Sequence, residues 1–360
     1  MRSGSIRTAI ASDVGLKRRN NQDSGIARRG VYVVCDGMGG GMGGERASRL
    51  AVDRLARLAD QPERGRDDID NALAEAQHDI LALGLELGGV AGTTISGLIL
   101  PTVPSEASSP SKMSIPSEMS ILSKATSPAE TTATATPTST NTRAATSTAT
   151  ATTGNPEPAK TPREFIDQAY VVNIGDSRTY HMNPLPRTDA DAEQVMTDDG
   201  LTDATPLWDA ASLTRITRDH SQRQEAIDSG RMLPEVAEAT IPRNIITQCL
   251  GDPNGIKPDV YVADMVGRFI VCSDGLHGEV PDDRIAAIAA AHANPQEAVD
   301  ALLADALNAG GTDNITVIVV DMPPVSPKHH AFSAYRLNVG EEIGVIEDST
   351  LQTLRTLRSA

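Results

Sequence analysis

Residues 30–37, with the sequence GVYVVCDG, decide the first element of the fold. This apolar run is rich in β-branched residues and stops at an Asp-Gly pair, which is typical of a buried strand that ends in a turn. The pattern returns in IVCSDG at 270–275 and in IGD at 174–176, and Asp313 lies just before another apolar run. One acidic turn at a strand end is ordinary. Four of them are harder to dismiss, because all could converge on one rim of a sheet.

Further strands and helices surround these turns. Apolar residues recur at helical spacing over four long segments: 45–59, 67–87, 282–292 and 295–308. Strands are predicted over 93–100, 168–174, 268–273 and 315–320, a short helix over 222–229, and a polar loop from there to Pro242. Several strands follow one another without a crossover helix. We therefore predict an α+β architecture with antiparallel sheets covered by helix pairs, rather than a doubly wound parallel sheet.

Two insertions interrupt this domain, which we expect to span residues 1–322. Residues 101–163 consist mostly of Ser, Thr, Ala and Pro, and such a segment buries too little apolar surface to offset its conformational entropy. We expect a disordered, passive insertion there, with a phosphorylatable regulatory linker as the alternative. Residues 183–211 are expected to form an acidic surface loop, and residues 323–360 a C-terminal tail.

Composition narrows the classes of function. The chain has 32 Lys and Arg against 48 Asp and Glu, a formal net charge of −16. Nucleic acid and anionic lipid both require a basic face, so neither is an expected partner. Three distant cysteines contain no CxxC pair, which supports neither a disulfide framework nor a zinc site. The N-terminus has no signal-peptide core and no run is long enough to cross a bilayer. We expect a cytoplasmic protein.

The acidic turns point to metal chemistry. Carboxylates at the ends of buried strands are costly unless a positive charge neutralises them. Oxygen ligands select hard cations such as Mg²⁺ or Mn²⁺ over zinc or copper. A pair of these ions can lower the pKa of a shared water and stabilise an in-line displacement at phosphorus.

The order of the motifs makes this signal specific. The chain contains, in sequence, DVGLKRRNNQD at 13–23, DGMGG at 36–40, GTT at 92–94, GDSR at 175–178, TRDHS at 217–221, SDGL at 273–276 and GTDN at 311–314. This succession resembles the metal-dependent protein phosphatase family, the type 2C Ser/Thr phosphatases, in its compact bacterial form. The resemblance covers about residues 6–322. It implies a four-layer β-sandwich of antiparallel sheets flanked on both sides by helix pairs, with a mobile flap over 221–244.

The resemblance also implies a set of metal ligands. Asp36 corresponds to the carboxylate that bridges two Mg²⁺ or Mn²⁺ ions, and the Gly37 carbonyl completes one coordination shell. Asp274 and Asp313 correspond to ligands of the second ion. Asp176 falls where many bacterial members hold a weaker third metal.

Two catalytic positions follow from the same resemblance. Arg18 matches the arginine that grips the substrate phosphate, a role that suits a guanidinium fork. Asp23 matches an acidic residue that orients metal-bound water. Gln22 stands where glutamate is common and Gly41 where bacterial members usually carry histidine. Met38 cannot act as the proton donor that distant relatives have at its position, so we assign no general acid.

Two other motifs are weaker. Asp219, His220 and Ser221 invite a catalytic-triad interpretation, but adjacent residues rarely point at one another, so we expect structural roles. Residues 39–44 are glycine-rich but lack the GxxxxGK[ST] pattern of a nucleotide-binding loop.

The resulting expectation is a protein Ser/Thr phosphatase that acts on phosphorylated proteins and opposes a Ser/Thr kinase. One alternative is a pseudophosphatase that binds a phosphorylated partner without hydrolysing it. Another is a phosphatase domain that acts chiefly as a sensor, regulated through the insertion or the tail.

Overall fold

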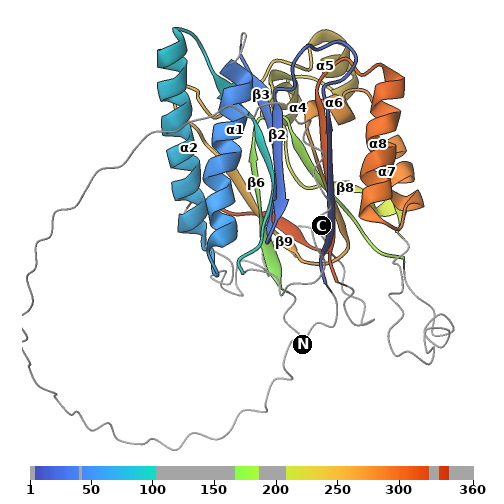
Figure 1. The fold of residues 1–360 in the computed structure, drawn as a ribbon. Coiled ribbons are helices and arrows are strands. Elements are labelled where there is room, and N and C mark those ends of the chain that lie inside the picture. The colour runs from blue at the N-terminus through green and yellow to red at the C-terminus, as the bar shows by residue number, and fades with distance from the viewer. Residues whose placement is uncertain (1–4, 40–42, 103–166, 186–207, 324–331, 340–360) are drawn as a thin grey trace, which may run out of the picture. The chain divides into compact units, whose positions relative to one another are not determined.

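The computed structural model describes residues 5–39, 43–102, 167–185, 208–323 and 332–339. Most of the predicted insertion at 101–163, of the loop at 183–211 and of the tail at 323–360 lies outside these residues. So does Gly41. Figure 1 shows the arrangement of the described elements.

The strands form two sheets in which all pairs are antiparallel. The first sheet has the order β1 (Arg7–Asp13), β11 (Ile315–Asp321), β10 (Arg268–Cys272), β7 (Arg178–Met182) and β8 (Thr214–Arg215). The second has the order β12 (Ala334–Arg336), β9 (Asp259–Asp264), β6 (Gln168–Ile174), β5 (Ile95–Ile99), β3 (Val31–Met38) and β2 (Asp23–Arg28), with β4 (Gly92–Thr93) beside β3. The central strands are continuous apolar runs because both faces of each sheet are covered.

Long helices cover the outer faces of both sheets, as Figure 1 shows. The second sheet is covered by α1 (Gly43–Ala56), which continues as a 3₁₀ turn (Arg57–Asp60), and by α2 (Arg66–Leu87). The first sheet is covered by α7 (Asp282–Ala291) and α8 (Pro295–Ala309). The shorter elements are the 3₁₀ turn Ala210–Ser212, α4 (Gln222–Asp228), α5 (Pro234–Thr240) and α6 (Asp274–His277).

Three apolar cores separate these four layers. Leu55, Leu73 and Ile80 of the first helix pair pack on one face of the second sheet. Its other face meets the first sheet through residues such as Leu98 and Val271. The predicted α+β fold of antiparallel sheets between helix pairs is therefore confirmed.

Several local details differ from the sequence expectations. The strands β1, β2, β7, β8 and β9 lie where no strand was predicted. The predicted polar loop before Pro242 contains the helix α5, which begins with Pro234, a residue preorganised for a first helical turn. Trp208, expected on a surface loop, is 4% exposed, and the Arg268 guanidinium lies 4.5 Å from its ring centroid. Within the range expected to be a tail, β12 adds an edge strand to β9. No helix in the described ranges is both long and apolar enough to span a membrane.

Candidate active site

The topology brings the acidic turns to one end of the two sheets. In the second sheet β3 runs antiparallel to β5, and β5 runs antiparallel to β6. The strands β3 and β6 therefore run in the same direction, and their C-terminal ends lie at the same end of the sheet. In the first sheet the end of β10 lies beside the start of β11. We call the five carboxylates at this end of the sheets the acidic rim: Asp23, Asp36, Asp176, Asp274 and Asp313.

Burial and mutual repulsion act on the carboxylates of the acidic rim. Burial raises the pKa of Asp36 well above its usual 3.8, and the charges of the other four carboxylates raise it further. Burial, with the charges of Asp274 and Asp219, raises the pKa of Asp176 to about 8. Burial and the charge of Asp313 raise the pKa of Asp274. The four predicted metal-binding carboxylates therefore influence one another, as a shared site requires.

Asp23 lies opposite Asp36 on the paired strands β2 and β3. The Ser273 hydroxyl donates a hydrogen bond of 2.7 Å to Asp23 Oδ2. Burial raises the pKa of Asp23 to about 7, although the hydrogen bond from Ser273 opposes this shift. Ser273 is fully buried and also accepts a hydrogen bond from the Thr316 backbone amide (2.9 Å), so it links Asp23 to the first sheet.

The residues of the acidic rim fit divalent cations. Their donors are all oxygen atoms, and Asp274 Oδ1 is buried without a hydrogen-bond partner among the described residues. A cation would reverse the raised pKa values, because it favours the ionised carboxylate. Within the described ranges, no three Asp, Glu, His or Cys side chains are gathered as tightly as a bound ion requires.

Gly37 is in a position that admits no side chain. A Cβ atom there would lie 2.2 Å from the carbonyl oxygen of Gly44 and 2.5 Å from that of Gln22. The end of β3 thus packs directly against the start of α1, and the Gly37 backbone amide donates to the Gln22 carbonyl (3.2 Å). This close packing explains why position 37 is a glycine. The role of the Gly37 carbonyl as a metal ligand stays a prediction.

Arg18 lies in the loop between β1 and β2 and contacts the acidic rim. Its Nη2 atom donates to Asp313 Oδ2 at 2.6 Å, and the Arg18 side chain is 48% exposed. Asn314 holds this loop: its amide donates to the carbonyls of Val14 (2.9 Å) and Asn20 (3.0 Å) and accepts from the Gln22 backbone amide (2.8 Å). The structure therefore brings Arg18 together with the carboxylates.

Three residues that support the acidic rim have no role predicted from the sequence. Thr94 Oγ1 accepts from the Asp36 backbone amide (3.0 Å) and contacts the Ser177 hydroxyl (2.7 Å). His277 Nε2 lies 3.0 Å from the Asp176 carbonyl oxygen, and burial lowers the pKa of His277 to about 3. A neutral His277 therefore donates to that carbonyl. The GTT motif at 92–94 is visible in the sequence, but only the fold shows what Thr94 contacts.

The catalytic-triad interpretation is excluded by the contacts of its members. Asp219 accepts two hydrogen bonds from the Arg178 guanidinium (2.7 and 3.0 Å). Ser221 caps the start of α4 by accepting from the Gln224 backbone amide (3.2 Å). His220 faces Asp259, with 3.4 Å between Nε2 and Oδ2. The three side chains make separate contacts, as expected for adjacent residues.

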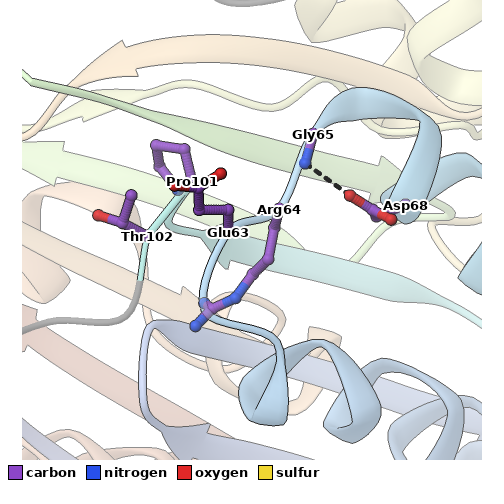
Figure 2. Close-up of a pocket in the computed structure, with 6 residues that line it drawn as sticks. All are labelled: Glu63, Arg64, Gly65, Asp68, Pro101 and Thr102. Carbon is purple, nitrogen blue, oxygen red and sulfur yellow. Dashed lines mark hydrogen bonds between the residues drawn. The ribbon is translucent and has the colours of Figure 1, made fainter.

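A separate pocket lies at the opposite end of β5 and β3, as the register of these strands shows. Figure 2 shows Arg64, Asp68 and Thr102 among the residues that line its volume of about 550 Å³. The Arg64 side chain is buried, and it donates to the carbonyls of Leu100, Arg29 and Gln61. The Arg64 guanidinium is therefore used in hydrogen bonds that stabilise the fold, and the pocket is not part of the acidic rim.

The chain is similar in sequence to known bacterial protein phosphatases. No family model matches the chain. The Ser/Thr protein phosphatase PstP of Mycobacterium tuberculosis is 27% identical over 325 residues, which are 88% of this chain and 45% of PstP. The protein phosphatase PhpP of Streptococcus pneumoniae is 36% identical over 110 residues, 30% of this chain and 45% of PhpP. The chain thus spans about half the length of the curated relatives it matches.

Solved structures share the fold. The crystal structure of the Mycobacterium tuberculosis Ser/Thr phosphatase PstP/Ppp matches with a TM-score of 0.60 at 25% identity, over 89% of this chain and 100% of that one. The catalytic domain of PstP in complex with two manganese ions matches with a TM-score of 0.57 at 25% identity, over 89% of this chain and 99% of that one.

Proposed function

Since the chain is a relative of the bacterial metal-dependent (type 2C) Ser/Thr phosphatases, we propose that it hydrolyses phosphoserine and phosphothreonine on proteins. The acidic rim is the observation that carries the proposal, because its carboxylates lie together at one end of the sheets and burial raises the pKa values of Asp36, Asp176 and Asp274. Two Mn²⁺ or Mg²⁺ ions are the proposed cofactors, with a weaker third site.

The metal ligands are assigned in the same proposal. Asp36 would hold both ions, the Gly37 carbonyl would add a ligand to one of them, and Asp274 and Asp313 would hold the second ion. Asp176 contributes to the weaker site. When bound, such ions supply Lewis acidity: they lower the pKa of a water and stabilise charge at phosphorus.

Two further side chains act on the substrate and the water. The exposed guanidinium of Arg18 binds the substrate phosphate. The contact between Arg18 and Asp313 keeps this guanidinium at the acidic rim. Asp23, held by Ser273, accepts a hydrogen bond from the attacking water and orients it.

We assign the activity to residues 1–322, with the insertions at 101–163 and 183–211 outside the catalytic machinery. Phosphorylated proteins are the proposed substrates, and a Ser/Thr kinase is the natural opposing partner. We propose that this activity acts in the cytoplasm. A pseudophosphatase is expected to have lost metal ligands, and the carboxylates at positions 36, 274 and 313 are all retained.

The proposal is tested by phosphate release from matched phosphoserine, phosphothreonine and phosphotyrosine peptides, with Mn²⁺ and with EDTA. We expect turnover of the first two peptides with Mn²⁺ only. Turnover that persists in EDTA, or a preference for phosphotyrosine, contradicts the proposal.

A further inference from the structure

The turn that carries Asp176 is clamped by His220. The Gly175 backbone amide donates to His220 Nδ1 (3.2 Å), and the His220 backbone amide donates to the Gly175 carbonyl (2.8 Å). The Asn173 side-chain amide adds a longer bond to the same carbonyl (3.3 Å). One peptide on each side of Gly175 is therefore fixed by a single residue from a distant segment.

The turn requires glycine at position 175. Its φ of +98° lies in a region that favours glycine, and a Cβ atom there would lie 2.6 Å from Thr94 Cγ2. Thr94 in turn binds the backbone of Asp36. The position of the Gly175 peptide consequently affects both Asp176 and the support of Asp36.

The contacts of His220 also determine its tautomer. Because Nδ1 accepts from Gly175, the proton of the neutral ring is on Nε2, which faces Asp259 Oδ2 at 3.4 Å. His220 is 9% exposed and Asp259 is 4% exposed, so water competes little with this contact. Tyr261 donates its hydroxyl to the same carboxylate oxygen (3.1 Å). Asp259 therefore orients the ring, as carboxylates behind metal-site histidines do.

The edge strand β12 supplies the countercharge for Asp259. The Arg336 guanidinium binds Asp259 Oδ1. Arg336 itself is placed by the pairing of β12 with β9 and by the hydrogen bond from the Leu337 amide to the Val260 carbonyl (2.7 Å). Leu337 is buried in the core under the first helix pair. The strand β12 is thus connected to the acidic rim by one continuous set of contacts.

We propose that His220 is a positioning residue for Asp176, that Asp259 fixes its ring, and that Arg336 of β12 holds Asp259. The inference rests on the proposed function, since it gives Asp176 a role in the weaker metal site. It gives the TRDHS motif and β12 one joint role, which is to hold the Gly175 peptide so that Asp176 can bind a cation.

Variants at His220 test the clamp in the full chain. His220→Leu removes the Nδ1 acceptor, whereas His220→Asn offers an amide oxygen at a similar place. We expect His220→Leu to weaken the weakest Mn²⁺ site about 10- to 100-fold, the usual effect of losing such a supporting residue. His220→Asn is expected to recover most of this affinity. The readouts are Mn²⁺ calorimetry, the Mn²⁺ activation constant, and the KM for an aryl phosphate at saturating Mn²⁺, which stays within about twofold.

Arg336→Ala keeps the test informative if His220→Leu does not fold, because the Arg336 side chain is 61% exposed. It is expected to weaken the same site about tenfold. Arg284→Ala is the matched control, since Arg284 is a similarly exposed arginine paired with Asp305 between α7 and α8. Its Mn²⁺ affinity is expected to equal that of the wild type.

The outcomes separate the two proposals. Unchanged Mn²⁺ affinity in Arg336→Ala and in folded His220→Leu overturns the clamp, provided that the wild type is active. A loss of kcat at every Mn²⁺ concentration, with unchanged affinity, also overturns it. A wild type without any Mn²⁺-dependent turnover overturns the proposed function instead.

Discussion

Replacing Asp176 with asparagine in the metal-free protein probes the repulsion within the acidic rim. The pKa of Asp176 is raised from 3.8 to about 8, so the folded state keeps a proton that the unfolded chain releases. The stability of metal-free protein therefore falls as the pH rises from about 4 to about 8. Asparagine resembles the protonated acid in shape and does not ionise, so it removes this loss.

The magnitude follows from the shift. At about 1.36 kcal/mol per pKa unit, the shift sets a ceiling of about 5 kcal/mol at pH 8, and about a third of that at pH 5. Relaxation around a buried charge reduces such penalties. We expect Asp176→Asn to raise the free energy of unfolding by about 2 kcal/mol at pH 8 and by well under 1 kcal/mol at pH 5.

Urea unfolding in EDTA at the two pH values measures this difference. Asp53→Asn is the matched control, since it removes the same charge from an exposed position on α1 and is expected to change nothing. Added Mn²⁺ should stabilise the wild type more than Asp176→Asn. The reasoning is refuted if Asp176→Asn is no more stable than the wild type at pH 8, or if its gain is equal at both pH values.

Two further predictions concern the residues around the acidic rim. Arg18→Ala should lower kcat/KM for a phosphothreonine peptide about 10- to 100-fold, because it removes hydrogen bonds to a charged group. The control Lys17→Ala, at the exposed neighbouring position, should change kcat/KM little, and equal losses in the two variants contradict a specific phosphate contact. Ser273→Ala should lower the free energy of unfolding by about 1–3 kcal/mol in urea, because it leaves Asp23 Oδ2 and the Thr316 amide without their bonds, while Ser229→Ala on an exposed helix end should cost under about 1 kcal/mol. An equal cost for both serines contradicts the buried network.

Much of the fold follows from patterns that are visible in the sequence. The strand at 30–35, the helix at 67–87 and the strand at 315–320 have uniform burial or a clear apolar stripe, and the structure has each of them within a few residues. The edge strands β1 and β12 escaped prediction because they are half buried and short on apolar residues, so their pairing partners decide their conformation. Trp208 was misplaced because its partner, Arg268, is distant in the sequence.

The candidate site was predictable in its carboxylates and less so in their supports. Asp36, Asp176 and Asp274 each follow an apolar strand, which is a local signal, and the sheet topology gathers them as expected. The supports Thr94 and Asn314 make contacts across long sequence separations, and small polar residues next to strands have no pattern that reveals such contacts. The relation of Arg336 to His220 depends on β12, which the sequence did not indicate.

The most direct test of the central claim is phosphate release from a phosphothreonine peptide as a function of Mn²⁺ concentration, for the wild type and Asp274→Ala. We expect saturable, Mn²⁺-dependent turnover in the wild type, and a loss of at least about 100-fold in the variant with its circular dichroism unchanged, since it lacks a carboxylate of the proposed two-metal site. Turnover in Asp274→Ala equal to that of the wild type, or a wild type inactive at every Mn²⁺ concentration, contradicts the claim that the acidic rim is a two-metal phosphatase centre.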